Sequence, residues 1–71
     1  MKNVKLLEAI GKFLDSDHVT HYTIDGYYGF AYLDIEEFNT DTMKIEVRRW
    51  KFNIVDDAVE IEDKGIQLTK D

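Results

Sequence analysis

Two residue types, cysteine and proline, are absent from this chain of 71 residues. Without cysteine the chain forms no disulfide, and zinc or iron–sulfur sites built from thiolates are excluded. A small domain without disulfides is typical of a reducing cytosol, so we predict a cytoplasmic protein. Long apolar runs are absent as well, because none reaches the roughly 18 residues that a membrane-spanning helix needs.

Basic residues are scarce: Lys and Arg number 9 against 15 Asp and Glu, which gives a net charge of −6. Neither Lys nor Arg occurs between Phe13 and Met43, although seven carboxylates do. Sequence-independent binding of duplex DNA requires cations that displace counterions from the phosphates. The composition therefore argues against such binding and favours a partner with a basic surface.

Motifs that would indicate catalysis are missing, because the chain has no nucleophile elbow and no glycine-rich phosphate loop. We expect no enzyme, no catalytic residue and no cofactor. Residues 15–21 place two carboxylates and two histidines close together, which zinc could use. A polar turn at the end of a helix is the favoured interpretation, so no metal site is predicted. We interpret Asp56-Asp57 and Glu36-Glu37 as solvated pairs and not as acid–base dyads.

The residues that are present predict one folded domain over 1–71, since 44% of them are hydrophobic. Residues 3–14 carry apolar side chains at helical spacing, with Asn3 as the expected N-cap. Gly11 in this helix is expected to allow a close approach to a sheet. Strands are predicted at 19–24, 27–35, 43–54, 58–62 and 66–69. We therefore expect an α+β fold, with one N-terminal helix (about 3–14) packed on an antiparallel sheet of four to five strands in two layers.

Four connections between the strands are predicted from turn chemistry. Asp25-Gly26 is expected to form a two-residue hairpin turn, because Asp-Gly accepts positive φ at both positions. Residues 36–42 are polar and predict a loop, and 55–57 predict a turn. Residues 63–65 predict a three-residue loop in which Gly65 takes the left-handed conformation.

The strand predicted at 43–54 changes phase in its middle. Ile45 and Val47 are apolar at odd positions, whereas Phe52 and Ile54 are apolar at even positions. Side chains in a strand alternate between two faces, so both pairs cannot share one face of a regular strand. A β-bulge at Arg48-Arg49 would bring them together. Without a bulge, the two halves of the strand would bury opposite faces.

The second predicted strand is apolar on both faces. Its even-numbered aromatic residues form one row, and Ala31, Leu33 and Ile35 form the other. One helix covers only one face of a small sheet, so one row should stay partly exposed. Tyrosine suits such a position, because it is enriched at protein interfaces.

In size, charge and aromatic content the chain resembles the small acidic proteins by which phages and mobile elements block host nucleic-acid enzymes, such as anti-CRISPR proteins and DNA-mimic inhibitors of uracil-DNA glycosylase. This class-level resemblance implies an inhibitor or modulator that binds a basic, nucleic-acid-binding surface of a host protein. The predicted contact residues are Asp34, Glu36, Glu37, Asp41, Asp56, Asp57, Glu60 and Glu62 for charge, with Tyr27, Tyr28 and Tyr32 as anchors.

Two alternatives stay open. The first is a nucleic-acid-binding or regulatory domain that uses the basic strand 44–51, with Lys44, Arg48, Arg49, Trp50 and Lys51. The second is a homo-oligomeric accessory protein, for example a homodimer, whose exposed tyrosines contact each other.

Overall fold

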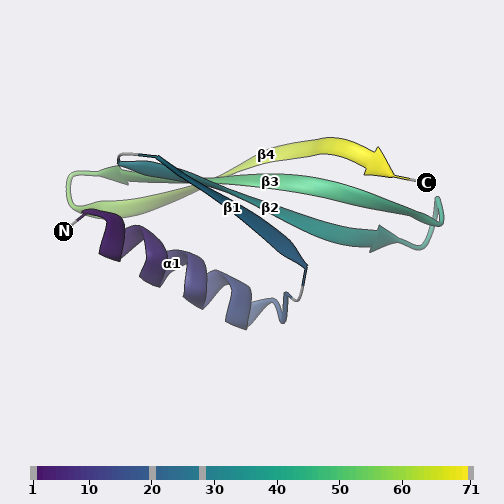
Figure 1. Cartoon of the computed structure of the whole chain (residues 1–71), viewed down its shortest axis with the longest axis horizontal. Coiled ribbons are helices and arrows are strands. Elements are labelled where there is room, and N and C mark those ends of the chain that lie inside the picture. The colour runs from purple at the N-terminus through teal and green to yellow at the C-terminus, as the bar shows by residue number, and fades with distance from the viewer. Residues whose placement is uncertain (1, 20, 28, 71) are drawn as a thin grey trace.

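The computed structural model describes residues 2–19, 21–27 and 29–70. A helix, α1 (Lys2–Ser16), precedes four strands: β1 (Tyr22–Tyr27), β2 (Phe30–Asn39), β3 (Lys44–Val55) and β4 (Ala58–Lys70). The strands form one antiparallel sheet in chain order. The helix lies on one face of this sheet (Figure 1). The predicted two-layer α+β fold with one N-terminal helix is confirmed.

The core lies between α1 and the middle of the sheet. Its buried side chains are Leu6, Ile10, Ala31, Leu33, Ile35 and Phe52. Phe13 extends this core, with ring centroids 5.0 Å from Trp50 and 5.7 Å from Phe52. Each large apolar side chain contributes about 1.5–3 kcal/mol when it is fully buried. These contacts hold the helix over β2 and β3, and the row Ala31, Leu33 and Ile35 is the one that it covers.

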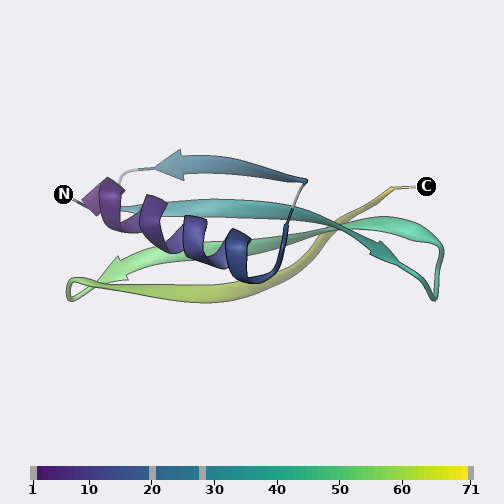
Figure 2. The ribbon, with the colours of Figure 1, turned by 90° about the horizontal axis from the view of Figure 1, so that it is seen from below.

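The helix covers only part of the sheet. Its 15 residues span about 22 Å at 1.5 Å per residue, whereas the molecule measures 41 Å along its longest axis. The β2–β3 hairpin and the end of β4 project beyond the helix (Figure 2). We call this projection the tongue (residues 36–48 and 63–70). We call the sheet face on which α1 lies the helix side and the opposite face the open face.

β3 runs without interruption, so the β-bulge predicted at Arg48-Arg49 is wrong for this strand. Its register with β2 shows no shift, and its even-numbered residues share the helix side with Leu33 and Ile35. Ile45 and Val47 consequently lie on the open face. The second expectation, apolar residues on opposite faces in the two halves, is the one confirmed. The irregularity lies in β4, which has one extra, unpaired residue opposite Val47/Arg48 and another opposite Arg49/Trp50.

Two predicted connections lie elsewhere in the structure. Asp25 and Gly26 belong to β1, and Tyr27 pairs with Phe30, so the turn comes after the Asp-Gly pair. Pairing with β3 extends β2 to Asn39, so the predicted loop 36–42 is restricted to the turn after this residue. The ladder overrides local turn propensity in both cases.

The β3–β4 region shows how positive φ is used. Asp56 and Asp57 have φ of 51° and 65°, as the two central residues of a type I′ turn require, so the turn at 55–57 is confirmed. The loop predicted at 63–65 is instead part of β4. Gly65 does adopt the expected left-handed φ of 81°, but it does so beside a register shift.

The ends of α1 also differ from expectation. The helix begins at Lys2, which places the backbone of Asn3 within its first turn, and the Asn3 side chain predicted as N-cap lies outside what the structure describes. At the other end the Val19 N–H donates to the Leu14 carbonyl at 3.0 Å, and the His18 N–H donates to that of Asp15 at 3.3 Å. With His18 at φ 53°, this is a Schellman motif. Gly11 is exposed and nothing lies within 4 Å of an added Cβ, so the predicted close approach to the sheet is wrong.

Candidate functional site

The basic residues of β3 are divided between two faces. Lys44, Arg48 and Trp50 lie on the helix side, whereas Arg49 and Lys51 lie on the open face. Trp50 packs against Phe13 beneath the helix and is half-buried. The five residues that suggested nucleic-acid binding therefore do not form one continuous surface.

On the open face, Arg49 is held by Asp34 of β2. Its Nε and Nη2 atoms donate to the two Asp34 carboxylate oxygens at 2.8 and 3.0 Å. The guanidinium also lies 4.9 Å from the centre of the Tyr32 ring. The hydrogen bond to Asp34 raises the pKa of Arg49 above its ordinary value. Asp34, predicted as a contact carboxylate, is thus neutralised within the chain.

Glu36 has a partner on the same face. The Lys70 ammonium donates to its Oε1 at 2.6 Å, and this hydrogen bond lowers the pKa of Glu36 below its usual value. Lys51 lies 5.2 Å from the centre of the Phe30 ring, and Lys64 contacts Glu62 at 3.2 Å. Cations and carboxylates on the open face therefore largely balance.

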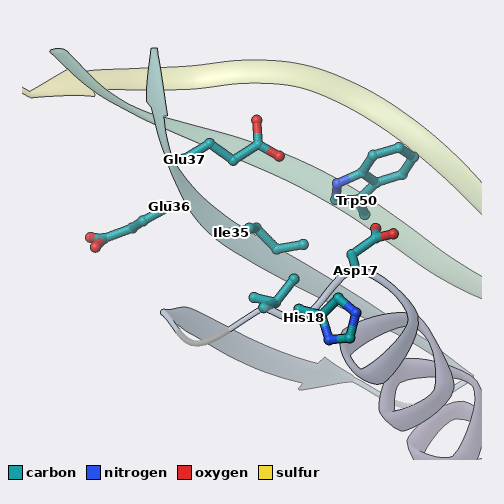
Figure 3. Close-up of a pocket in the computed structure, with 7 residues that line it drawn as sticks. Asp17, His18, Ile35, Glu36, Glu37 and Trp50 are labelled. Carbon is teal, nitrogen blue, oxygen red and sulfur yellow. The ribbon is translucent and has the colours of Figure 1, made fainter. Parts of the chain in front are cut away.

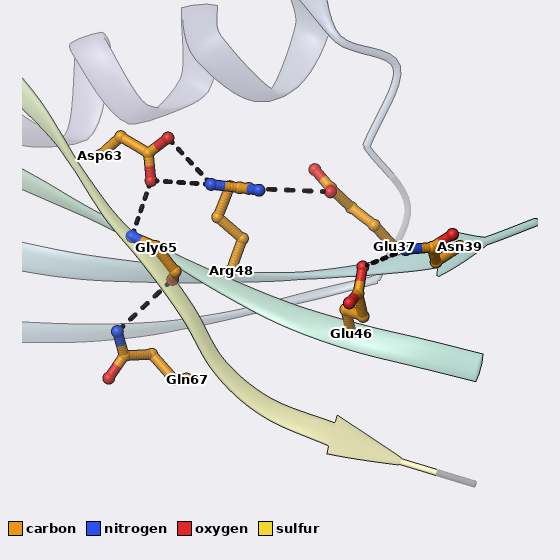
Figure 4. Close-up of polar contacts among 7 residues, drawn as sticks. All are labelled: Glu37, Asn39, Glu46, Arg48, Asp63, Gly65 and Gln67. Carbon is orange, nitrogen blue, oxygen red and sulfur yellow. Dashed lines mark hydrogen bonds and ion pairs between the residues drawn. The ribbon is translucent and has the colours of Figure 1, made fainter. Parts of the chain in front are cut away.

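On the helix side a single guanidinium faces several carboxylates (Figure 4). Arg48 Nη1 donates to both Asp63 oxygens at 3.1 and 2.9 Å, and its Nε lies 3.9 Å from Glu37. Asp63 also accepts the Gly65 N–H at 2.7 Å, which is the main reason that its pKa lies below the usual value. Arg48 thereby connects β2, β3 and β4 in the tongue.

Two like charges meet beside Arg48. Glu37 of β2 and Glu46 of β3 are directly opposite in the register and share the helix side. Glu46 accepts a hydrogen bond from Asn39 at 3.0 Å, which fixes its carboxylate near this position. Like charges directly opposite in a sheet destabilise it, by about 0.2–1 kcal/mol. We call Asp17, Glu37, Glu46 and Asp63 the acidic surface.

A pocket of about 380 Å³ opens at one side of the acidic surface. Asp17 and His18 from the end of α1 line it together with Ile35, Glu37 and Trp50 (Figure 3). In this view the Glu36 and Glu37 side chains point away from each other. The indole Nε1 of Trp50 is buried and has no hydrogen-bond partner.

Residues 15–19 form the end of α1 and the turn that follows it, which agrees with the predicted polar turn, and Thr20 lies outside the described residues. His18 occupies the left-handed position of the Schellman motif. Among the described residues, no group of three or more histidine or acidic side chains could hold a metal ion. Within 2–19, 21–27 and 29–70, no helix has the length and apolar content to cross a membrane.

The remaining predicted contact residues are scattered. Asp41 lies in the β2–β3 turn, and Asp56 and Asp57 lie in the β3–β4 turn at the other end of the sheet. Tyr32, Glu60 and Glu62 lie on the open face. Only the main chain of Tyr27 is described, at the end of β1, and Tyr28 lies outside the described residues.

The sequence interpretation missed Asp17 and Glu46 as members of a charged surface. Glu46 stands alone among basic residues, so charge clustering along the chain did not single it out. The signal that could have found it is strand register: a hairpin with its turn at 40–43 places Glu46 opposite Glu37.

Comparison with known proteins adds no relative: no family model, no curated protein and no solved structure matches the chain.

Proposed function

We propose that the chain is a non-catalytic, cytoplasmic binding module that docks its acidic surface on a basic, nucleic-acid-binding surface of another protein and so inhibits or modulates it. The observation that supports this most directly is the opposition of Glu37 and Glu46 across the β2–β3 ladder. This pair weakens the sheet, and cations of a partner would relieve its repulsion. Asp63 on Arg48 and Asp17, which lines a pocket together with Glu37, extend the same charge.

The distribution of charge favours the helix side over the open face. On the open face, Asp34 and Glu36 each hold a cation of the chain itself. On the helix side, Glu37 and Asp63 share the single guanidinium of Arg48, whereas Glu46 accepts a hydrogen bond from Asn39 and Asp17 lines the adjoining pocket. Unsatisfied charge of one sign raises the rate of association with the opposite sign, with limited cost in desolvation at an exposed site.

The test is capture of nucleic-acid-binding proteins from a bacterial lysate on the immobilised chain, with duplex DNA as competitor. We expect the captured proteins to be released by DNA and by an increase of ionic strength, because the Debye length falls from about 8 Å at 0.15 M to about 3 Å at 1 M. The double variant Glu37→Gln/Glu46→Gln should lose capture. The matched control Asp25→Asn/Glu60→Gln removes the same charge from the open face and should keep it.

A second readout separates binding from folding. Removing the repulsion should make Glu37→Gln/Glu46→Gln more stable than the wild type, by up to about 1 kcal/mol in urea unfolding. A more stable variant that no longer binds assigns the carboxylates to the partner. Capture that ignores salt, DNA and both glutamates would reject the proposal. A gel shift of labelled duplex DNA by the chain alone would favour the basic-strand alternative.

A further inference from the structure

The two edges of the sheet are protected to very different degrees. β4 has two register shifts and carries Glu60, Glu62, Asp63, Lys64 and Lys70, which are features that block pairing with another strand. β1 pairs with β2 without any shift, and within residues 22–26 it has one charged side chain, Asp25. Its sequence Tyr-Thr-Ile is among the most favourable for a strand. The edge at β1 is therefore open to a further strand.

An apolar strip accompanies this edge on the helix side. Among the described residues, α1 packs against β2, β3 and β4 but not against β1. Ile24 and Tyr22 of β1 are consequently 38% and 48% exposed. Val4 and Leu7, on the helix flank away from the Lys5–Asp57 contact, are 43% and 61% exposed. The molecule exposes 5099 Å², about 10% more than the roughly 4,600 Å² typical of a compact monomer of its mass.

We propose that β1 pairs antiparallel with β1 of a second copy, which forms a twofold-symmetric dimer with a continuous eight-stranded sheet. A twofold axis perpendicular to the sheet places both helices on the same face. Their flanks with Val4 and Leu7 then approach each other above Ile24 and Tyr22. The second copy would pair with the exposed β1 edge and cover the apolar strip at the same time. This inference is independent of the proposed function.

The register follows from the hydrogen bonds and the charges. The Glu36 N–H donates to the His21 carbonyl, so odd-numbered residues of β1 bond toward β2, and Tyr22, Ile24 and Gly26 direct their main-chain groups outward. Centring the pair on Ile24 sets Tyr22 opposite Gly26 of the second copy and Asp25 opposite Thr23. Centring it on Asp25 would oppose two carboxylates, and centring it on Thr23 would shorten the ladder.

The first test is the mass of the chain in sedimentation equilibrium over a series of concentrations. We expect a dimer of 16.8 kDa, twice the 8.4 kDa of one chain. Ile24→Pro removes an N–H that points outward, so the β1–β2 ladder stays intact. This variant should weaken the dimer at least about tenfold, because both twofold-related hydrogen bonds are lost.

Ile61→Pro is the matched control. Ile61 lies on the other edge strand and is 48% exposed. The Ile54 N–H donates to the Gly29 carbonyl, so even-numbered residues of β3 form hydrogen bonds with β2 and odd-numbered ones form them with β4. Ile61 is opposite the even-numbered Phe52, so its N–H points outward. This variant should dimerise like the wild type. A chain that stays monomeric at all concentrations would overturn the proposal. An equal loss of dimer affinity in Ile24→Pro and Ile61→Pro would overturn it as well.

A disulfide cross-link between single-cysteine variants tests the register, because the chain has no cysteine of its own. A hydrogen-bonded antiparallel pair has its Cα atoms about 5.5 Å apart, within the range of a disulfide. Ile24→Cys should therefore form a covalent dimer on mild oxidation, and Ile61→Cys should not. Faster cross-linking of Thr23→Cys than of Ile24→Cys would reject the register centred on Ile24.

Discussion

Replacement of His18 by glycine should stabilise the protein. His18 is the left-handed residue of the Schellman motif, with φ 53°, and the Val19 and His18 N–H bonds to the helix end define that conformation. A residue with a Cβ atom in the left-handed conformation costs roughly 1–2 kcal/mol, and glycine removes this cost. Glycine also has greater freedom in the unfolded chain, which reduces the gain by about 0.5–1 kcal/mol. The expected net gain is about 0.5–1 kcal/mol. For a domain of this size, that corresponds to a rise in Tm of roughly 4–8 °C at the upper value.

The assay is urea unfolding followed by circular dichroism, together with thermal melts. His18→Ala is the control, because alanine removes the imidazole and keeps the left-handed strain, so no gain is expected from it. A loss of stability in His18→Gly would refute the reasoning and assign a stabilising contact to the imidazole. An equal gain in both variants would also refute it, because the gain would then come from removal of the imidazole and not from relief of the left-handed conformation. Zinc should shift the Tm of neither wild type nor variant, since no metal-binding group is formed around His18 among the described residues.

Three further predictions concern other elements. Gly11→Ala should stabilise the chain by about 1 kcal/mol in urea unfolding, because α1 gains helix propensity and the new Cβ meets nothing within 4 Å; a loss would contradict the open space around Gly11. Trp50→Phe should change the free energy of unfolding by less than about 1 kcal/mol, because removing the unpartnered buried Nε1–H offsets the lost ring contacts, and a loss above 3 kcal/mol would indicate a hidden acceptor. The Lys70 contact that lowers the pKa of Glu36 stabilises the fold fully at neutral pH, and this contribution is lost as pH falls through the folded-state pKa. The urea midpoints of the wild type and Glu36→Gln should therefore differ at pH 7, and this difference should vanish in acid. A difference that does not change with pH would refute the Lys70 linkage.

The phase change in β3 shows how far the sequence alone could go. Its apolar residues lie at odd positions in the first half and at even positions in the second half. Both a bulge and a change of the buried face are compatible with this pattern. The decision depends on the helix. Because α1 spans about half of the sheet, Phe52 and Ile54 meet it, whereas Ile45 and Val47 lie beyond it on the open face.

Charge illustrates the same limit at the candidate site. Clustering along the chain grouped Asp34, Glu36 and Glu37, yet alternation in β2 sends the first two to one face and the third to the other. The acidic surface instead joins residues from the turn after α1, from β2, from β3 and from β4, which are far apart along the sequence.

The sequence by itself determined the elements whose signals are local. The amphipathic period of residues 3–14 predicted the helix, and the alternation in residues 27–35 predicted a strand with two apolar rows. Only the structure shows that Ala31, Leu33 and Ile35 form the core row. Tertiary structure alone decided the turn after Tyr27, the bulges in β4 and the meeting of Glu37 with Glu46. These features depend on which strands pair and in which register, and that choice minimises the free energy of the whole sheet, so a favourable local signal such as Asp25-Gly26 can be overruled.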